Sequence, residues 1–269
     1  MPGKLSLFIA CLCLGAATGA VAEAGQPVVS RLLITDVTPV SFSAIWISSE
    51  SSTCSLRVFD GQGQQLTQLA MVSESAAHPP AEELGVMKVR VDGLGLDTAY
   101  SVQTVTTSKA DGKVTVYPDQ PLSVHTEKSA APIDNSVLVR QIFAKNGANA
   151  DGALLVIKVA GSSSPVTGWV GQYEWPPSPW APADLSNVYS AVTHTPLEVR
   201  GGESMGVEGY GGKLGYALLQ ETVPTPTQDV FIPLNPPLVL NPKQGLCSSQ
   251  GDFYFIPNKK GGGAVIFLD

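Results

Sequence analysis

Hydrophobic and polar residues alternate along much of the first half of the chain. In the run SFSAIWIS, Phe42, Ala44 and Trp46 fall on one side of an extended backbone, and the residues between them fall on the other. Residues 54–59 and 86–94 alternate in the same way, and turn-forming sequences such as DGQG separate the runs. A period of two is typical of antiparallel strands with one face in a core, and no stretch of ten or more residues shows a helical stripe. The pattern therefore predicts a β-sandwich over this half.

One segment between these strands breaks the alternation. Residues 73–85, SESAAHPPAEELG, combine two prolines with small polar residues. Such composition favours a loop, here one that extends an edge of the sandwich. His78 lies within it, and we expect its ring to be solvated.

The second half of the chain also predicts strands punctuated by glycine and proline. The predicted strands are residues 137–144, 153–161, 196–202, 204–212, 229–234, 252–257 and 264–269. That number of strands suits a second sandwich. We therefore expect an all-β fold of two tandem β-sandwich domains, residues 28–126 and 137–269, joined by the polar linker 127–136.

The first residues have the features of a signal peptide. Lys4 precedes the apolar stretch 5–17, and the small residues Ala20 to Ala22 suit a signal peptidase. We expect cleavage of residues 1–22 near Ala22 and a secreted, periplasmic or cell-surface protein. A competing interpretation takes FIAC as a lipobox with Cys11 lipidated, but its apolar region is short and Phe8 stands where leucine is preferred. No other apolar run approaches the length of about 18 residues that a membrane-spanning helix needs.

Charge narrows the partners. The chain has 16 Lys and Arg against 23 Asp and Glu, a net charge of −7, and neither sign is clustered. Nucleic acid and anionic membranes require a concentrated basic face, so neither is expected as a partner. A protein or polysaccharide outside the cytoplasm is the expected partner.

Two cysteines remain after signal cleavage, Cys54 and Cys247. In an oxidising compartment they are candidates for a disulfide, which would stabilise the chain by about 4 to 5 kcal/mol in the entropy model. Two buried free thiols are the alternative.

Two sequences resemble the fibronectin type III family: ITDVTPVSFSAIW, residues 34–46, and LGLDTAY, residues 94–100. The matching positions are Trp46, Leu94, Thr98 and Tyr100. Leu96 stands where the family usually has proline. The resemblance implies structural roles: Trp46 fills the space between two sheets, and the Tyr100 hydroxyl caps backbone at a corner. It implies a spacer or binding scaffold and no chemistry.

A second resemblance covers about residues 137–220. The turn and long apolar strand in ADGALLVIKVAGSSSPVTGWVG, residues 150–171, are similar to carboxypeptidase regulatory-like or transthyretin-like modules. These modules are β-sandwiches that act as spacers, stabilisers or binders. The resemblance therefore leaves the functional class unchanged.

One motif raises the question of catalysis. GESMG, residues 202–206, matches the G-x-S-x-G nucleophile elbow, which needs a helix after Ser204 and a histidine later in the chain. A glycine-rich alternating run follows instead, and no histidine occurs after His194. We interpret the motif as a turn and expect no enzyme. Neither a metal site nor a cofactor is expected, because His78, His125 and the cysteines show no ligand spacing.

Aromatic residues and prolines gather in GQYEWPPSPWAPADLSNVYS, residues 171–190. The candidate ligand-binding residues are Trp169, Tyr173, Trp175, Trp180 and Tyr189. Proline cannot donate to a strand ladder, so this stretch predicts a stiff excursion outside the sheet, with one helical turn begun by Asp184. The excursion either presents the rings as a clamp for a ligand or folds them over the core as a lid.

Three functions follow from these patterns, in descending order. The first is an exported non-catalytic scaffold, adhesion or assembly module. The second is a carbohydrate- or peptide-binding protein that uses the aromatic residues between Trp169 and Tyr189. The third is a serine hydrolase acting through Ser204.

Overall fold

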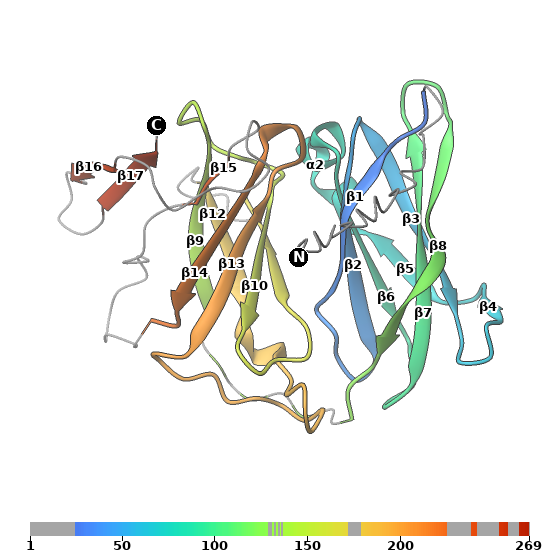
Figure 1. The fold of residues 1–269 in the computed structure, drawn as a ribbon. Helices are drawn as coiled ribbons and strands as arrows, with labels where there is room; N and C mark the ends of the chain where they lie inside the picture. The colour runs from blue at the N-terminus through green and yellow to red at the C-terminus, as the bar shows by residue number, and fades with distance from the viewer. Residues whose placement is uncertain are drawn as a thin grey trace, which may run out of the picture.

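The fold is all-β, as expected from the alternation (Figure 1). The computed structural model describes residues 25–128, 131, 133, 135, 137–171, 179–224 and 238–240, and the backbone of 253–257 and 264–268. The helical segments are short: α1 (Glu74–Ala77), α2 (Pro79–Leu84), and the 3-10 turns η1 (Leu185–Asn187) and η2 (Gly212–Leu214). Within the described part of the chain, none of the helices could cross a membrane.

The N-terminal half, residues 25–128, contains two facing sheets. The first, the β2 sheet, has the order β1 (Val29–Thr35), β2 (Ser41–Ser48), β6 (Val86–Asp92), β5 (Ala70–Ser73). The second, the β3 sheet, has the order β4 (Gln65–Leu66), β3 (Ser52–Phe59), β7 (Ala99–Ser108), β8 (Val114–His125). All neighbouring strands in both sheets are antiparallel. An apolar core that includes Phe42, Trp46, Val58 and Val89 lies between them.

The C-terminal half, residues 137–240, contains another pair. The β10 sheet has the order β11 (Val166–Trp169), β10 (Leu154–Val159), β13 (Ser204–Tyr210), β14 (Tyr216–Thr222). The β9 sheet has the order β12 (Trp180–Asp184), β9 (Val137–Ala144), β15 (Leu238–Leu240), and β15 runs parallel to β9. A separate hairpin joins β16 (Phe253–Pro257) and β17 (Ala264–Leu268). The core between the β10 and β9 sheets includes Ile142, Leu155, Met205 and Leu240.

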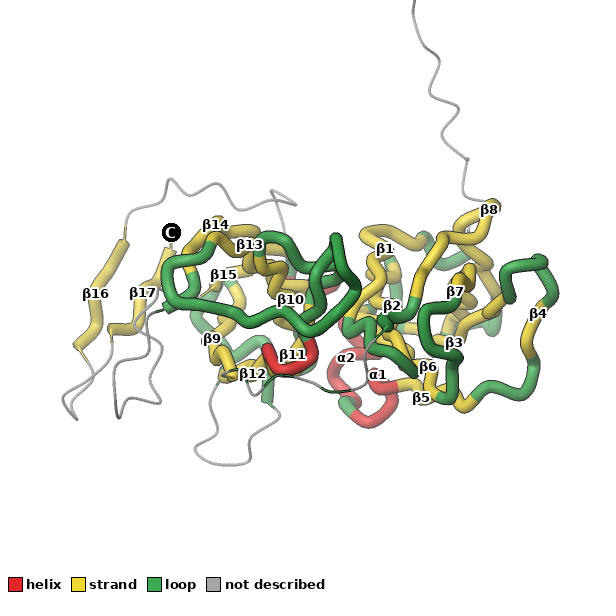
Figure 2. Tube along the Cα trace, turned by 90° about the horizontal axis from the view of Figure 1, so that it is seen from below, coloured by secondary structure: helices red, strands yellow, loops and turns green. Residues whose placement is uncertain are grey.

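The four sheets stack in the order β3, β2, β10, β9, as the view in Figure 2 shows. The contact between the β2 sheet and the β10 sheet, here called the central interface, joins the two halves. Its apolar cluster combines Ile45, Ala81 and Val86 with Leu154, Val156, Trp169, Tyr210 and Tyr216. The inner two sheets are therefore buried on both faces.

Two residues of the fibronectin-like pattern lie at structural positions. Trp46 is fully buried in the core of the N-terminal half, where its indole N–H donates to Thr106 Oγ1 at 2.9 Å. The Tyr100 hydroxyl accepts the Gly95 backbone N–H at 2.9 Å. A buried indole and a phenol each need a polar partner, and these contacts supply one.

Segment 73–85 was expected to be a loop, and that expectation is wrong. It forms α1 and α2, which lie beside the β2 sheet at the central interface. Pro79 begins α2, a position where the fixed φ of proline favours a helix start and no donor is lost. Gly85 ends it in the left-handed conformation, with φ of 80°.

The proline-rich stretch also differs from expectation where it is described. Residues 180–184 form strand β12, and Pro182 pairs with Val139 of β9. The expected excursion outside the sheet is therefore wrong for these residues. Because β12 is an edge strand, the missing N–H of Pro182 costs no ladder bond. The helical turn after Asp184 is confirmed, since Asp184 Oδ1 accepts the Ser186 N–H at 2.8 Å.

Several strand assignments in the C-terminal half need correction. Residues 196–202 form no strand, because only Pro196 makes an isolated bridge, to Tyr189. Strands β11, β14 and β15 were not predicted. Residues 229–234 lie outside the described residues.

Candidate functional site

Ser204 stands at the start of strand β13, with its side chain exposed. A turn with Gly202 at φ of 89° precedes it, and the chain continues as a strand. A nucleophile elbow needs a helix at this point. The geometry around Ser204 is therefore that of a turn entering a strand.

The aromatic residues singled out in the sequence do not form one exposed group. Trp169 is 4% exposed and Tyr189 is 2% exposed, so neither ring offers a face to a ligand. Trp180 is half-buried in the edge strand β12. Tyr173 and Trp175 lie outside the described residues. Within the described part, Trp169 belongs to the central interface instead of a surface platform.

Cys54 is half-buried and carries a free thiol. Its sulfur lies 3.2 Å from Ser73 Oγ, and burial raises the pKa of the thiol above its ordinary value. Cys247 lies outside the described residues. The Cys54–Cys247 disulfide therefore stays a prediction.

The strongest concentration of buried ionisable groups lies at the central interface, around Lys88. The Lys88 ammonium is 2.8 Å from Glu74 Oε2 and 3.2 Å from Asp36 Oδ2, and it donates to Thr167 Oγ1 at 2.8 Å. The Lys88 side chain is 8% exposed. Lys88 and Glu74 come from β6 and α1, Asp36 follows β1, and Thr167 lies on β11 of the other half. These residues with Trp169 are the Lys88 cluster.

Asp36 connects the halves within this cluster. Its carboxylate accepts the Thr167 backbone N–H at Oδ1 (2.8 Å) and the Thr167 hydroxyl at Oδ2 (2.7 Å). Its own backbone N–H donates to Pro165 O at 2.8 Å. Asp36 adopts a left-handed φ of 50°, which directs both its backbone and its side chain to the neighbouring half.

Opposite charges dominate the titration of the cluster. Burial opposes the ammonium form of Lys88, but attraction to Asp36 and Glu74 outweighs it and raises the pKa of Lys88. Burial likewise opposes the carboxylate of Asp36, yet Lys88 and the hydrogen bonds from Thr167 lower the pKa of Asp36. Each group is thus held in its charged form by its partner.

Aromatic rings close the cluster on one side. The Trp169 indole N–H donates to Glu74 Oε2 at 3.3 Å, and the His78 ring stacks on Trp169 with centroids 4.6 Å apart. Burial, with the nearby Lys88 charge, lowers the pKa of His78, so the ring favours its neutral form. His78 was expected in solvent, but it packs at the central interface.

Two glycines allow the backbones of the halves to approach closely. A Cβ at Gly152, before β10, would lie 2.6 Å from the Ala81 nitrogen of α2. A Cβ at Gly212 would lie 2.0 Å from the Leu84 carbonyl oxygen. Both glycines also have positive φ, at 84° and 55°. Helix α2 therefore fits against the C-terminal half only because side chains are absent here.

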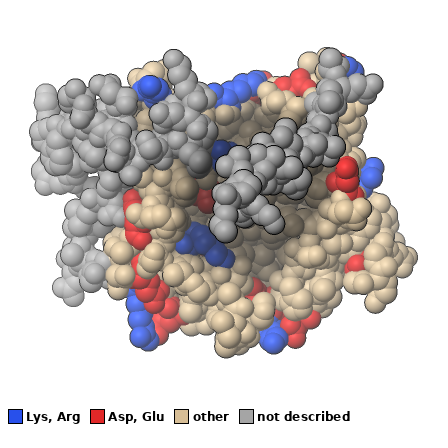
Figure 3. Space-filling view, viewed as in Figure 1, with Lys and Arg blue, Asp and Glu red and all other residues tan. Residues whose placement is uncertain are grey.

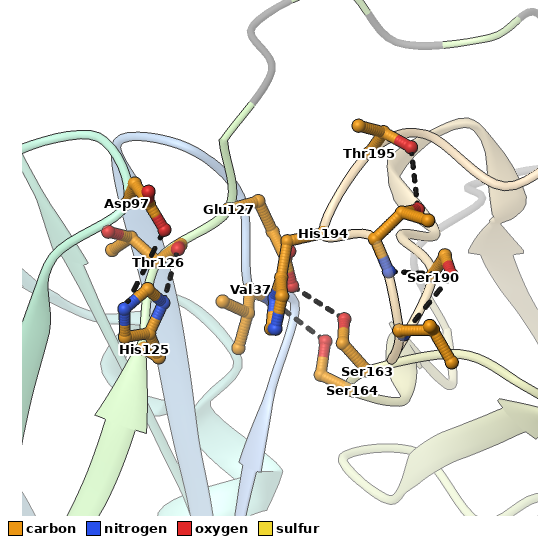
Figure 4. A network of polar contacts seen from close by, with 12 residues as sticks. Val37, Asp97, His125, Thr126, Glu127, Ser163, Ser164, Ser190, His194 and Thr195 are labelled. Carbon is orange, nitrogen blue, oxygen red and sulfur yellow. Dashed lines mark hydrogen bonds and ion pairs between the residues drawn. The ribbon is translucent and has the colours of Figure 1, made fainter.

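A second polar group, the Glu127 junction, lies where the chain leaves the N-terminal half (Figure 4). Glu127 is 1% exposed, and its carboxylate accepts Ser163 Oγ at 2.5 Å and lies 2.9 Å from His194 Nδ1. The His125 and His194 rings face each other with centroids 5.5 Å apart. Backbone bonds reinforce the contact, since the Lys128 N–H donates to His194 O at 3.0 Å.

A third contact lies at the β1 edge of the interface. The Arg31 guanidinium lies 3.6 Å above the Tyr216 ring, which meets Tyr210 edge-on with centroids 5.4 Å apart. The Tyr216 hydroxyl donates to Glu208. Burial and the Glu208 charge raise the pKa of both phenols. This arrangement combines a cation–π contact with a charge-assisted hydrogen bond.

These groups are arranged for adhesion between sheets and show no site for a ligand. In the described ranges, no three His, Cys, Asp or Glu side chains are placed to hold a metal ion. On the face seen in Figure 3, charged side chains occur singly or in small mixed groups, without a concentrated basic patch.

The sequence analysis did not identify the Lys88 cluster. Its members are scattered between Asp36 and Trp169, and Lys88 alternates with Met87 and Val89 as any solvated strand residue would. The one available signal was a lysine and an acid beside residues expected in a core. The chain matches no protein-family model and no curated protein.

Proposed function

We propose that the chain is an exported, non-catalytic scaffold or assembly module in which two β-sandwiches are docked as one body. The observation that carries the proposal is the central interface. It combines an apolar cluster with three separate polar contacts, around Lys88, Glu127 and Arg31. A spacer that must hold its two ends at a fixed distance and direction needs such an interface.

The strand order supports a scaffold class. In the N-terminal half, β1-β2-β6-β5 faces β3-β7-β8, which corresponds to the ABED and CFG sheets of immunoglobulin-type sandwiches. The fibronectin type III resemblance, with Trp46 in the core and Tyr100 at the corner, points the same way. Sandwiches of this type serve as spacers and binding scaffolds at cell surfaces.

Export is the part of the proposal that the N-terminal sequence supports. Lys4, the apolar stretch 5–17 and the small residues at Ala20 to Ala22 form a signal peptide pattern. Expression of the full chain followed by N-terminal mass spectrometry is expected to give a mature protein that begins near Glu23 outside the cytoplasm. Retention of Met1 in a cytoplasmic product would contradict export.

Distance measurements between the halves test the docking. Spin labels at Gln62 and Ala191, in a background of Cys54→Ser and Cys247→Ser, report on exposed sites in the two halves. We expect a single narrow distance distribution. A broad distribution would mean that the halves move independently and would remove the basis of the proposal.

The carbohydrate- or peptide-binding alternative loses two of its five aromatic residues, because Trp169 and Tyr189 are buried. A glycan array with wild type and a Trp175→Ala, Trp180→Ala double variant separates it from the scaffold. Binding that the double variant loses would favour the alternative. Equal, negligible signals are expected for the scaffold.

A further inference from the structure

The Lys88 cluster contains more acid than a simple ion pair requires. One ammonium faces two carboxylates, Asp36 at 3.2 Å and Glu74 at 2.8 Å. Arg90 is the other nearby cation, and its guanidinium is 3.9 Å from Glu74 Oε1. An amine, a carboxylic acid and a second carboxyl group in contact, largely shielded from water, are the components of an amide-forming reaction.

We propose that Lys88 and Asp36 become joined by an amide bond between Nζ and Cγ, with Glu74 as the catalytic proton relay. The bond would be an intramolecular modification of this chain. Its formation requires no partner and no cofactor, so it goes beyond the proposed scaffold function and does not depend on it.

The hydrogen bonds on Asp36 distinguish its two oxygens. Oδ1 accepts the Thr167 backbone N–H at 2.8 Å, and a backbone donor is suited to stabilising the oxyanion that forms when an amine attacks the carbon. Oδ2 lies nearest Nζ and also receives the Thr167 hydroxyl at 2.7 Å and the Thr35 hydroxyl at 3.0 Å. Donors on Oδ2 assist its departure. Oδ1 would therefore remain as the amide oxygen, and Oδ2 would leave.

The reaction balances without an oxidant or a reductant. A proton passes from the Lys88 ammonium to Asp36, which gives a neutral amine and a carboxylic acid. The nitrogen lone pair attacks Cγ, and Glu74 takes one proton from the nitrogen. Glu74 then returns that proton to the leaving hydroxyl, the Cγ–Oδ2 bond breaks, and water is released. Glu74 ends in its starting state.

Position and charge both favour the product. Groups held in contact react with effective concentrations of about 10⁵ to 10⁸ M when they are well oriented. The resting ion pair is stable, since each partner holds the other charged, so the proton transfer makes the reaction slow. A desolvated ion pair nevertheless keeps a large solvation cost, which a neutral amide removes. Glu74 keeps Arg90 as its counter-charge afterwards.

The bond would connect strands that are not neighbours. Asp36 follows β1 and Lys88 lies on β6, with β2 between them in the sheet. Because Thr167 of the C-terminal half supplies the oxyanion donor, the reaction would proceed only after the halves dock. The bond would then fix the β2 sheet at the place where it meets the β10 sheet.

Intact mass spectrometry of the purified full chain tests the proposal directly. We expect a mass below that of the mature sequence by one water molecule, and a single cross-linked peptide containing Asp36 and Lys88 after proteolysis. Lys88→Arg and Glu74→Gln are expected to restore the full mass. The matched control Lys109→Arg, at a surface lysine that pairs with Glu82 and Glu83, is expected to keep the deficit.

Two results would overturn the proposal. The first is an unmodified mass in folded wild-type protein after prolonged incubation, a measurement that needs no variant. The second is a deficit that persists in Lys88→Arg or disappears with hydroxylamine, since a succinimide at an Asp-Gly sequence such as Asp92-Gly93 also loses water. An amide between Lys88 and Asp36 resists hydroxylamine.

Discussion

Strands β2 and β6 are buried on both faces, but different forces stabilise the two faces. The face toward the β3 sheet is apolar, with Phe42, Trp46 and Val89 in one core. The face toward the β10 sheet mixes Ile45 and Val86 with the charged Lys88. The same pair of strands thus makes a conventional core on one side and a docking surface on the other.

The difference shows how one sheet can serve two kinds of contact. An apolar core tolerates many partners of the right volume, because the hydrophobic effect has no direction. Buried charges tolerate only a partner that supplies counter-charges and donors, since an unpaired buried charge is costly. Lys88, Asp36 and Thr167 therefore specify how the halves dock, while Ile45 and its neighbours contribute most of the buried apolar area.

Replacement of Trp46 should have the largest effect. Trp46→Ala removes the largest buried side chain of the inner core and is expected to lower the free energy of unfolding by about 3 to 5 kcal/mol. Urea denaturation measures it. A loss below that of an interface substitution would contradict the assignment of the inner face as the main core.

Ile45→Ala tests whether the outer face is a true core. Ile45 is fully buried at the central interface, so truncation is expected to cost about 2 to 4 kcal/mol. Urea unfolding is again the measurement. If this face were exposed to solvent, as strand alternation alone would suggest, the change would stay within about 0.5 kcal/mol.

Lys88→Met isolates the charged part of the interface. It leaves Asp36 and Glu74 without their cation and is expected to lower the free energy of unfolding by about 2 to 3 kcal/mol, less than for fully buried pairs because both carboxylates keep some exposure. Lys109→Met at the surface is the control, with an expected change of about 0 to 1 kcal/mol. Equal effects of the two substitutions would mean that the Lys88 cluster is not an effective contact.

Gly152→Ala tests the close approach of α2. Gly152 and Gly161 have similar positive φ, 84° and 78°, but only Gly152 has backbone within reach of an added Cβ. We expect Gly152→Ala to destabilise by about 1 to 3 kcal/mol more than Gly161→Ala, since both share the conformational strain and only one meets Ala81. Thermal unfolding with limited proteolysis compares them. Matching values would place α2 further from β10.

Alkaline titration gives the smallest effect. The phenols of Tyr210 and Tyr216 have pKa values raised above the ordinary 10.0 by burial and by Glu208. The folded chain therefore holds these protons above pH about 10 while the unfolded chain releases them, so stability falls as pH rises beyond that value. Absorbance of tyrosinate is expected to show two late-titrating phenols, and Glu208→Gln is expected to shift them toward earlier ionisation. Uniform titration of all tyrosines near pH 10 would contradict the buried contact.

Regular alternation made some elements predictable and left others hidden. Strands over residues 41–48, 86–92 and 154–159 follow directly from their period or apolar run. Strand β12 was missed because Pro182 argues against a strand, and only its edge position makes proline acceptable. Helices α1 and α2 are too short for a periodic signal, and the docking of α2 depends on Gly152 and Gly212, far along the chain.

The candidate residues divided in the same way. Trp169 was singled out as an aromatic residue between strands, and the structure places it in the central interface beside Glu74 and His78. Nothing local distinguishes a tryptophan that binds a ligand from one that packs against another sheet. The Tyr173 and Trp175 part of that hypothesis lies outside the described residues.

The sequence by itself determined that the chain is all-β, which face of each N-terminal strand enters the inner core, and where most turns occur, because these depend on neighbouring residues. Only the tertiary structure decided that the opposite face of the β2 sheet is also covered and that Asp36 meets Thr167, 131 positions away. A lysine on an outward-facing strand position has the same local pattern whether water or two carboxylates surround it. The identity of its surroundings is a property of the docked sheets, and chain folding alone brings them together.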